Sequence, residues 1–322
     1  MNAIRKIFAI VLLLVLVAVP AQAAYPEKAV RLIVPYPPGG LGDRTMRVIG
    51  ERLSRRLGQP VLIENKAGGG QILAAQAAAA AAPDGYTLLV GSITMLSLNQ
   101  VTVKNLPYDP RRAFEPISRL FDFPFFLVVN KDVPADSVAG LIALAKSKPG
   151  GLTVGSIGTG SSQHLAGEMF SQAAGVKFLH VPYKGSAEAN TDLLAGRIDL
   201  MFDPGVTVLP HAQTGRLKLL AITTAKRAAE HPNTPTLIES GLPGVEFTSW
   251  LGLLAPAGTP KPVLERLSSD MTQILNAPDL QQQFVKEGIK FHSSTPAEFA
   301  SFIESETIRF RKLVKDSGIS LD

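Results

Sequence analysis

Short apolar runs and amphipathic stretches alternate along the first part of the chain. Apolar runs bounded by glycine and proline are typical of buried strands, and apolar positions spaced three and four residues apart are typical of helices. Met46, Ile49 and Leu53 follow such a helical spacing. The predicted strands are 29–34, 61–63 and 86–90, and the predicted helices are 43–57 and 72–82. This order predicts a parallel sheet with helices on its faces.

The same alternation restarts further along and then changes near the end of the chain. The second set comprises predicted strands over 125–129, 153–156, 177–181, 200–202 and 217–223, and predicted helices over 137–147, 163–174 and 187–195. The last part has one apolar strand followed by three helices, at 251–255, 261–276, 278–286 and 296–316. Because a helical tail without its own sheet cannot bury a core, we expect it to return and cover the first sheet.

This organisation predicts an α/β fold of two lobes, each a mainly parallel sheet flanked by helices. Lobe 1 would be discontinuous, with residues 24–122 and 250–322, and lobe 2 would be inserted as residues 123–249. Two crossover strands then join the lobes, which is typical of hinged solute-binding proteins with a ligand cleft at the carboxyl ends of the strands. Trp250 falls at the second crossover, where it either senses closure of the cleft or packs inside lobe 1.

The N-terminal residues have the pattern of a cleavable signal peptide. Arg5 and Lys6 precede an apolar run over 7–19, and an A-x-A site ends at Ala23, so residues 1–23 would be removed. The apolar run has about 13 residues, which is shorter than the roughly 20 needed to span a bilayer. No cysteine follows the cleavage site that could carry a lipid. We therefore expect the mature protein in a bacterial periplasm.

Composition excludes several classes of function. The chain has 322 residues, 46% hydrophobic and 18% charged, so it can bury sizeable cores. With no cysteine it has no disulfide scaffold, no Cys-ligated metal and no thiol nucleophile. The net charge of +5 comes with no basic run longer than two residues, so nucleic acid is not an expected partner. The five histidines lack the close spacing of metal ligands, and we expect no metal and no cofactor.

The first candidate binding loop lies between the strand 29–34 and the helix 43–57. Its candidate ligand-binding residues are Tyr36, Pro38, Gly39 and Gly40. Glycines let the backbone approach a ligand, and a helix start presents unpaired N–H groups and the positive end of its dipole, which together suit a carboxylate. The alternative is a simple turn. For Asp43 we favour an N-cap role at the helix start.

The second candidate loop, 155–164, again joins a strand to a helix. Its candidate residues are Ser156, Thr159, Gly160, Ser161, Ser162 and His164. Hydroxyls and backbone N–H groups can hold a carboxylate without a fixed cation, although a Ser-rich N-cap would look the same. A hydrolase with Ser161 or Ser162, His164 and Asp203 is a competing interpretation. It is a poor one, because residues two apart at a helix start point to different faces.

Three further polar residues end predicted strands on the same side. Asp203 follows the strand 200–202, where it could accept a hydrogen bond from a ligand or cap the following loop. Lys184 follows another strand as the nearest basic candidate, with a solvated surface lysine as the alternative. Tyr183 could stack on a ligand or pack near the hinge.

Taken in order, a set of short motifs resembles the Bug-type extracytoplasmic solute receptors of tripartite tricarboxylate transporters. The matching segments are 25–26, 35–43, 64–70, 83–89, 106–110, 158–165, 181–185, 199–203 and 253–260. The resemblance implies a type II two-lobed (Venus flytrap) fold that closes on a small carboxylate through amides, hydroxyls and waters. It also implies delivery of that solute to a membrane permease by a monomeric receptor, although a ligand sensor for a signalling kinase has the same fold.

One stretch departs from the pattern of these receptors. Relatives often have a more polar sequence after the strand 86–90, whereas this chain has Met95 and Leu96 there. Ser92, in the same stretch, is a further candidate ligand-binding residue. The departure predicts a less polar wall, so an aromatic or aliphatic monocarboxylate is as plausible a ligand as a di- or tricarboxylate.

Overall fold

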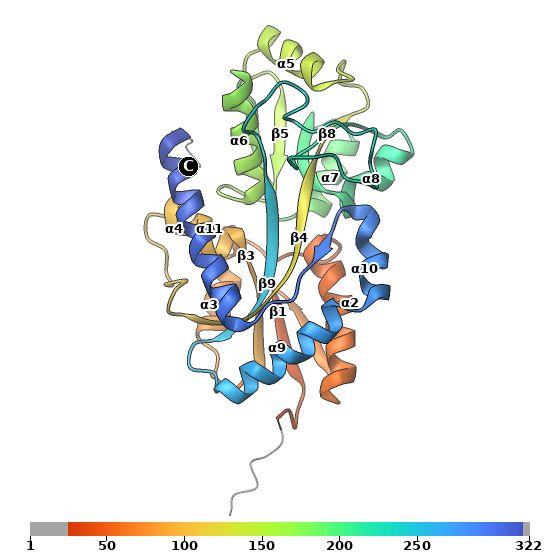
Figure 1. Cartoon of the computed structure of the whole chain (residues 1–322). Coiled ribbons are helices and arrows are strands. Elements are labelled where there is room, and N and C mark those ends of the chain that lie inside the picture. Colours follow the sequence, from red (N-terminus) through yellow and green to blue (C-terminus); the bar gives the residue numbers. More distant parts are fainter. Residues whose placement is uncertain (1–24, 318–322) are drawn as a thin grey trace, which may run out of the picture.

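The computed structural model describes residues 25–317 (Figure 1). The predicted signal peptide, residues 1–23, lies outside the described residues. The strands follow the order β2-β1-β3-β9-β4-β7-β5-β6 in one path, with β8 and β10 both paired to β4. In Figure 1 the path forms a lower and an upper lobe with helices on their faces, joined by the long strands β4 and β9. Two-lobed periplasmic binding proteins have this α/β architecture.

The lower lobe is built around a parallel core of three strands. These strands are β1 (Val30–Val34), β2 (Val61–Asn65) and β3 (Thr87–Ser92), and β9 (Thr248–Pro256) joins β3 antiparallel. Its first helices are α2 (Leu41–Leu57) and α3 (Ile72–Ala79). The predicted strands and helices of this part are confirmed, with ends displaced by a few residues.

The upper lobe repeats this construction. Its strands are β5 (Thr153–Ser156), β6 (Leu179–Pro182), β7 (Leu200–Pro204) and β8 (Leu217–Ile222). Strand β5 lies parallel to both β6 and β7. The helices are α5 (Val138–Ser147), α6 (Ser162–Ala174), α7 (Ser186–Leu194) and α8 (Gly205–Gln213). Each of α6, α7 and α8 starts just after a strand, at the edge that faces the lower lobe.

Strand β4 (Phe114–Asn130) belongs to both sheets. Up to Pro124 it pairs with β9, and from Phe125 onward it pairs with β7 and β8. The change of partner lies near the predicted lobe boundary at 122/123, and the lobe limits themselves stay a prediction. Only 125–129 had been expected as strand, because Pro116 and Pro124 interrupt the first part of the pattern.

The helices after β9 cover the lower sheet, as the sequence predicts. They are α9 (Lys261–Leu275), α10 (Pro278–Phe284) and α11 (Pro296–Ser317), with the short strand β10 (Lys290–Phe291) between the last two. Trp250 is almost fully buried, its ring packs edge-on against Phe299 and Phe302 of α11, and its indole N–H donates to Glu306 at 3.0 Å. Of the two interpretations given for Trp250, the structure therefore agrees with packing inside the lower lobe.

Three helical regions were absent from the sequence-based prediction. They are the 3₁₀ turn η1 (Gly69–Gln71), the π-helical turn η2 (Thr94–Leu98) with the short helix α4 (Asn99–Thr102), and α8. Helix α8 contains Pro210 and starts with a glycine, both weak helix signals. Among residues 25–317, we find no helix with the length and apolar character of a membrane span.

Candidate functional site

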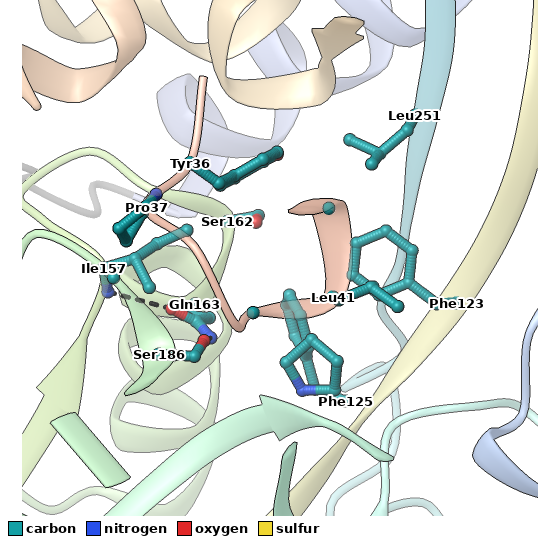
Figure 2. A pocket seen from close by; sticks show the side chains of 14 residues that line it. Tyr36, Pro37, Leu41, Phe123, Phe125, Ile157, Ser162, Gln163, Ser186 and Leu251 are labelled. Atoms are coloured by element: carbon teal, nitrogen blue, oxygen red, sulfur yellow. Dashed lines mark hydrogen bonds between the residues drawn. The ribbon is translucent and has the colours of Figure 1, made fainter. Parts of the chain in front are cut away.

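A cavity lies between the two lobes, where several helices begin (Figure 2). It encloses about 450 Å³ of space free of protein atoms, part of it open to solvent. Its lining residues are Tyr36, Pro37, Gly40, Leu41, Gly42, Phe123, Phe125, Ile157, Ser162, Gln163, Gly185, Ser186, Pro204 and Leu251.

Four helix N-termini converge on this cavity. Helix α2 contributes Leu41 and Gly42, α6 contributes Ser162, α7 begins at Ser186, and Pro204 immediately precedes α8. The first turn of a helix has N–H groups without intrahelical partners and the positive end of the dipole. The arrangement therefore favours an anion with several acceptor atoms, such as a carboxylate.

The two lobes are in contact across the cavity. Arg44 of α2 donates to the carbonyl of Val206 in α8 at 3.2 Å, and the Ser162 N–H donates to the Thr94 hydroxyl at 3.3 Å. Pro37 packs so closely against Gly185 that a Cβ on this glycine would lie 2.2 Å from the Pro37 Cγ atom. This is a closed arrangement of the lobes.

In the first loop, the carboxylate of Asp43, in the first turn of α2, holds the loop backbone by a hydrogen bond. The N-cap prediction was wrong: Gly40 is the N-cap residue, and Asp43 lies in the first turn. Its carboxylate accepts from Gly39 N at 2.9 Å and from Asn65 Nδ2 at 3.0 Å, and it pairs with Arg47. Burial raises the pKa of Asp43, but these bonds outweigh it, so the net pKa lies below its usual value.

The candidates of the first loop separate into lining and exposed residues. Tyr36 and Gly40 line the cavity, whereas Pro38 and Gly39 are exposed outside it, and the Gly39 N–H is already used by Asp43. Burial raises the pKa of Tyr36 to about 12. Ser92 lies behind Tyr36, fully buried, where it donates to Gln71 and accepts from the Met95 N–H. Ser92 therefore supports the wall and does not line it.

In the second loop, internal bonds occupy most of the polar groups. Ser161 caps α6 by accepting from His164 N at 3.3 Å, and Gly160 N donates to His164 Nδ1 at 3.2 Å. Ser156 bonds His180 Nε2 at 2.6 Å. Thr159 is exposed and does not line the cavity. Of the four predicted hydroxyl residues in this loop, only Ser162 lines the cavity. Ser161 is an N-cap residue, and Ser162 stays a candidate for ligand binding.

His164 is buried against His180 in a parallel stack, with ring centroids 3.7 Å apart and an interplanar angle of 6°. Burial, with the neighbouring His180, lowers the pKa of His164 to about 4. Its ring nitrogens face Gly160 N and, at 3.8 Å, Glu168 Oε1. Within the described residues we find no hydrogen bond from this ring to a serine hydroxyl, so the nucleophile and base of the hydrolase interpretation are not paired.

Asp203 is a buried anchor beneath the cavity. Its carboxylate accepts from Ser186 Oγ and Asn190 Nδ2, both at 2.7 Å, and from Gln163 and Thr207. These four donors belong to α6, α7 and α8, so a single carboxylate ties three helix starts together. Burial raises the pKa of Asp203 to about 6, although the four bonds act in the opposite direction. Asp203 contacts lining residues and does not itself line the cavity.

Tyr183 and Lys184 lie at a neighbouring hollow instead. This hollow has about 380 Å³ of free space and is lined by both residues together with Tyr36, the glycines 68–70 and Gly158. Lys184 is exposed, and the Tyr183 hydroxyl donates to Asp192 at 2.9 Å. Of the predicted residues, Gly40 and Ser162 line the cavity, Tyr183 and Lys184 line the hollow, Tyr36 lines both, and the others line neither space.

Several lining residues were missed by the sequence analysis. They are Pro37, Leu41, Gly42, Phe123, Phe125, Ile157, Gln163, Gly185, Ser186, Pro204 and Leu251. Gly185 and Ser186 follow β6, and Pro204 ends β7, at the same sheet edge, a signal that could have found them. Phe123, Phe125 and Leu251 come from the crossover strands, where side-chain direction depends on register. In the part of the chain from 25 to 317, no three His, Asp or Glu side chains gather to hold a metal.

Comparisons with known proteins identify the family of this chain. The sequence model of the family described as "Tripartite tricarboxylate transporter family receptor" matches residues 45–319. A "UPF0065 protein in tcbD-tcbE intergenic region" of Pseudomonas sp. (strain P51) is 37% identical over 292 residues, 90% of this chain and 87% of that protein. "Protein BugT" of Bordetella pertussis (strain Tohama I) is 34% identical over 307 residues, 95% of this chain and 94% of that protein.

Solved structures give the same result. An R. palustris protein solved with adipate has a TM-score of 0.89 and 34% identity, covering 92% of this chain and 99% of that one. MatC from Rhodopseudomonas palustris with bound malate has a TM-score of 0.85 and 30% identity, covering 90% of this chain and 100% of that one. With the family model matching most of its length and full-length relatives above 30% identity, the chain belongs to the tripartite tricarboxylate transporter receptor family.

Proposed function

We propose that this protein is a periplasmic solute receptor that captures a small organic carboxylate between its lobes. The observation that carries the proposal is the convergence of four helix N-termini on one cavity between the lobes. Helix-start N–H groups and the Ser162 hydroxyl would bind the carboxylate oxygens, and closure of the lobes would remove it from water. The related structures with bound adipate and malate support the same ligand class.

The proposal extends to compartment and partners. The signal-peptide pattern of residues 1–23, cut after Ala23, would bring the chain to the periplasm. There the closed, loaded monomer would deliver its solute to the membrane permease of a tripartite tricarboxylate-type transporter. Binding and release are the whole of this activity, and no catalytic residue is assigned.

Binding of carboxylates by the mature chain tests the proposal. We expect acids from a panel of mono-, di- and tricarboxylates to raise the melting temperature, because a ligand at 100 times its Kd stabilises the folded state by about 2.7 kcal/mol. The corresponding amides should bind at least about tenfold more weakly, a difference of roughly 1.4 kcal/mol. Equal affinity for acid and amide, or no binding of any acid, would contradict the proposal.

Ser162→Ala provides a test of the site itself. Removal of its hydroxyl should weaken carboxylate binding about 10- to 150-fold, the effect of one hydrogen bond to a charged group, about 1.5–3 kcal/mol. Ser171→Ala is the matched control on the same helix, because Ser171 donates to the Gly167 carbonyl and does not line the cavity. If both variants bind as the wild type does, Ser162 has no part in recognition.

A further inference from the structure

A second space, larger than the cavity, lies beside the crossover strands β4 and β9. It has about 1350 Å³ free of protein atoms, part of it open to solvent. Residues 122–124, 246 and 248 line it along the crossover strands, residues 222 and 224–230 line it from the upper lobe, and residues 285 and 288–290 line it from the lower lobe. We call this space the hinge groove.

The hinge groove and the cavity lie on opposite faces of the crossover strands. Successive side chains of a strand point to opposite faces. On β4, Phe123 and Phe125 line the cavity, and Pro124 between them lines the groove. On β9, Leu251 lines the cavity and Thr248 lines the groove. Phe123 borders both spaces, so the crossover strands stand between them.

The two walls of the groove belong to different lobes. The upper wall follows β8, and the lower wall consists of the turn η3 (Val285–Glu287) with the residues up to β10. Among the described lining residues we find no hydrogen bond or ion pair from one wall to the other. Next to the lining, His231 Nε2 lies 2.7 Å from the Lys286 carbonyl oxygen. The relative position of the lobes, not a set of bonds across the gap, therefore sets the width of the groove.

The closed arrangement of the lobes combines a smaller cavity with a larger groove. Their free volumes are about 450 Å³ and about 1350 Å³. When two rigid lobes rotate about the strands that join them, a space on one face of the strands widens as the space on the other face narrows. Opening of the cavity to admit or release a solute must then bring the walls of the groove together.

From these observations we propose that the hinge groove controls the equilibrium between the open and the closed receptor. Side chains on its facing walls set how far the lobes can open. Added bulk in the groove excludes the open form and raises the affinity for the solute, because the closed form is then populated before the solute binds. This effect on affinity rests on the proposed function, although the groove residues lie on the far side of the crossover strands from the cavity.

Two tryptophan variants, one on each wall, test the proposal. Ala229→Trp fills the groove from the upper lobe and Val285→Trp from the lower lobe, and both positions are exposed and line the groove. Ala139→Trp is the matched control, because Ala139 is exposed on α5, at the far end of the upper lobe (Figure 1). In small-angle scattering without solute, we expect both groove variants to be more compact than the wild type and the control.

Affinity provides a second readout. By calorimetry with the carboxylate that the wild type binds most tightly, Kd should fall at least about fivefold in each groove variant, which corresponds to about 1 kcal/mol of overpacking in the open form. Stopped-flow measurements should show slower dissociation, since the solute leaves through the open form. Damage to the fold would weaken binding, so a gain in affinity cannot arise from it.

The outcomes distinguish this proposal from the proposed function. Groove variants that keep the wild-type radius of gyration and Kd, or that bind more weakly, would overturn the role of the groove and leave the carboxylate receptor standing. An unliganded wild type as compact as its ligand-bound form would also overturn it, because no opening would remain for the groove to limit. If no carboxylate binds but the groove variants are still compact, the proposed function fails and the hinge role stands.

Discussion

Gly185→Ala should hinder closure of the lobes without damaging either lobe. The new methyl would point at Pro37, which belongs to the first loop of the lower lobe, whereas Gly185 starts α7 in the upper lobe. The backbone tolerates the change, because Gly185 has φ of −176°, an extended conformation that any residue adopts. The substitution therefore affects a contact that exists only when the lobes meet.

The structure sets the size of this effect. The added Cβ would lie 2.2 Å from Pro37 Cγ, whereas carbon atoms in contact lie about 3.5–4.0 Å apart. The two loops must then separate by more than about 1 Å. Overpacking of this kind typically costs about 1–3 kcal/mol. Because the unliganded chain can avoid the clash by opening, the cost falls on the ligand-bound closed form, and Kd should rise about 5- to 150-fold.

Calorimetry with the carboxylate that the wild type binds most tightly gives the change in Kd, and small-angle scattering gives the compaction on binding. Gly167→Ala is the matched control, since its Cβ would meet Val154 Cγ2 at an ordinary 3.6 Å within the upper lobe. We expect unchanged affinity for the control, and an unchanged melting temperature for unliganded Gly185→Ala. Wild-type affinity and full compaction in Gly185→Ala would refute the closure argument.

Three further predictions concern the supports of the site. Asp203→Asn should lower the free energy of unfolding by about 2–3 kcal/mol at pH 7.5 in urea denaturation, because an amide N–H₂ replaces an oxygen that accepts from two donors; a loss under about 0.5 kcal/mol would contradict the anchor role. Gly252→Ala should cost about 1–3 kcal/mol in the same assay, because its Cβ would lie 2.0 Å from the Phe299 ring, and wild-type stability would show that α11 yields easily. The pKa of His164 is about 4 in the folded protein and 6.5 in the unfolded chain, so the unfolded chain binds more protons between these two pH values. The stability that this residue contributes is therefore lost as pH falls from 6.5 to 4. Relative to His164→Asn, the wild type should lose up to about 3 kcal/mol of unfolding free energy over this range, and parallel pH profiles of the two proteins would contradict the prediction.

The local pattern of the sequence determined most of the elements. Helix α2 follows from the spacing of Met46, Ile49 and Leu53, and β5 lies at the predicted strand 153–156. The return of the C-terminal helices to the first sheet also followed from the sequence, because an amphipathic tail must find an apolar surface. Helix α8 was not predicted, because Gly205 and Pro210 have low helix propensity, which tertiary contacts override.

The sequence likewise located two of the helix starts that line the cavity. Glycines and hydroxyl residues after a strand have a local meaning, since they permit close backbone approach and cap a helix. That local meaning is ambiguous between capping and binding. Ser161 and Ser162 are neighbours with similar chemistry, yet Ser161 caps α6 and Ser162 lines the cavity.

Only the tertiary structure decided which polar groups remain available and what faces them. Asp43 and Asp203 could each have met a ligand, but donors from other elements occupy both carboxylates. Leu41, Phe123, Phe125 and Leu251 line the cavity together, although they come from three segments that are far apart in the chain. Their meeting depends on the register of β4 with β9 and on the contact between lobes, and both arise from long-range packing that no local pattern encodes.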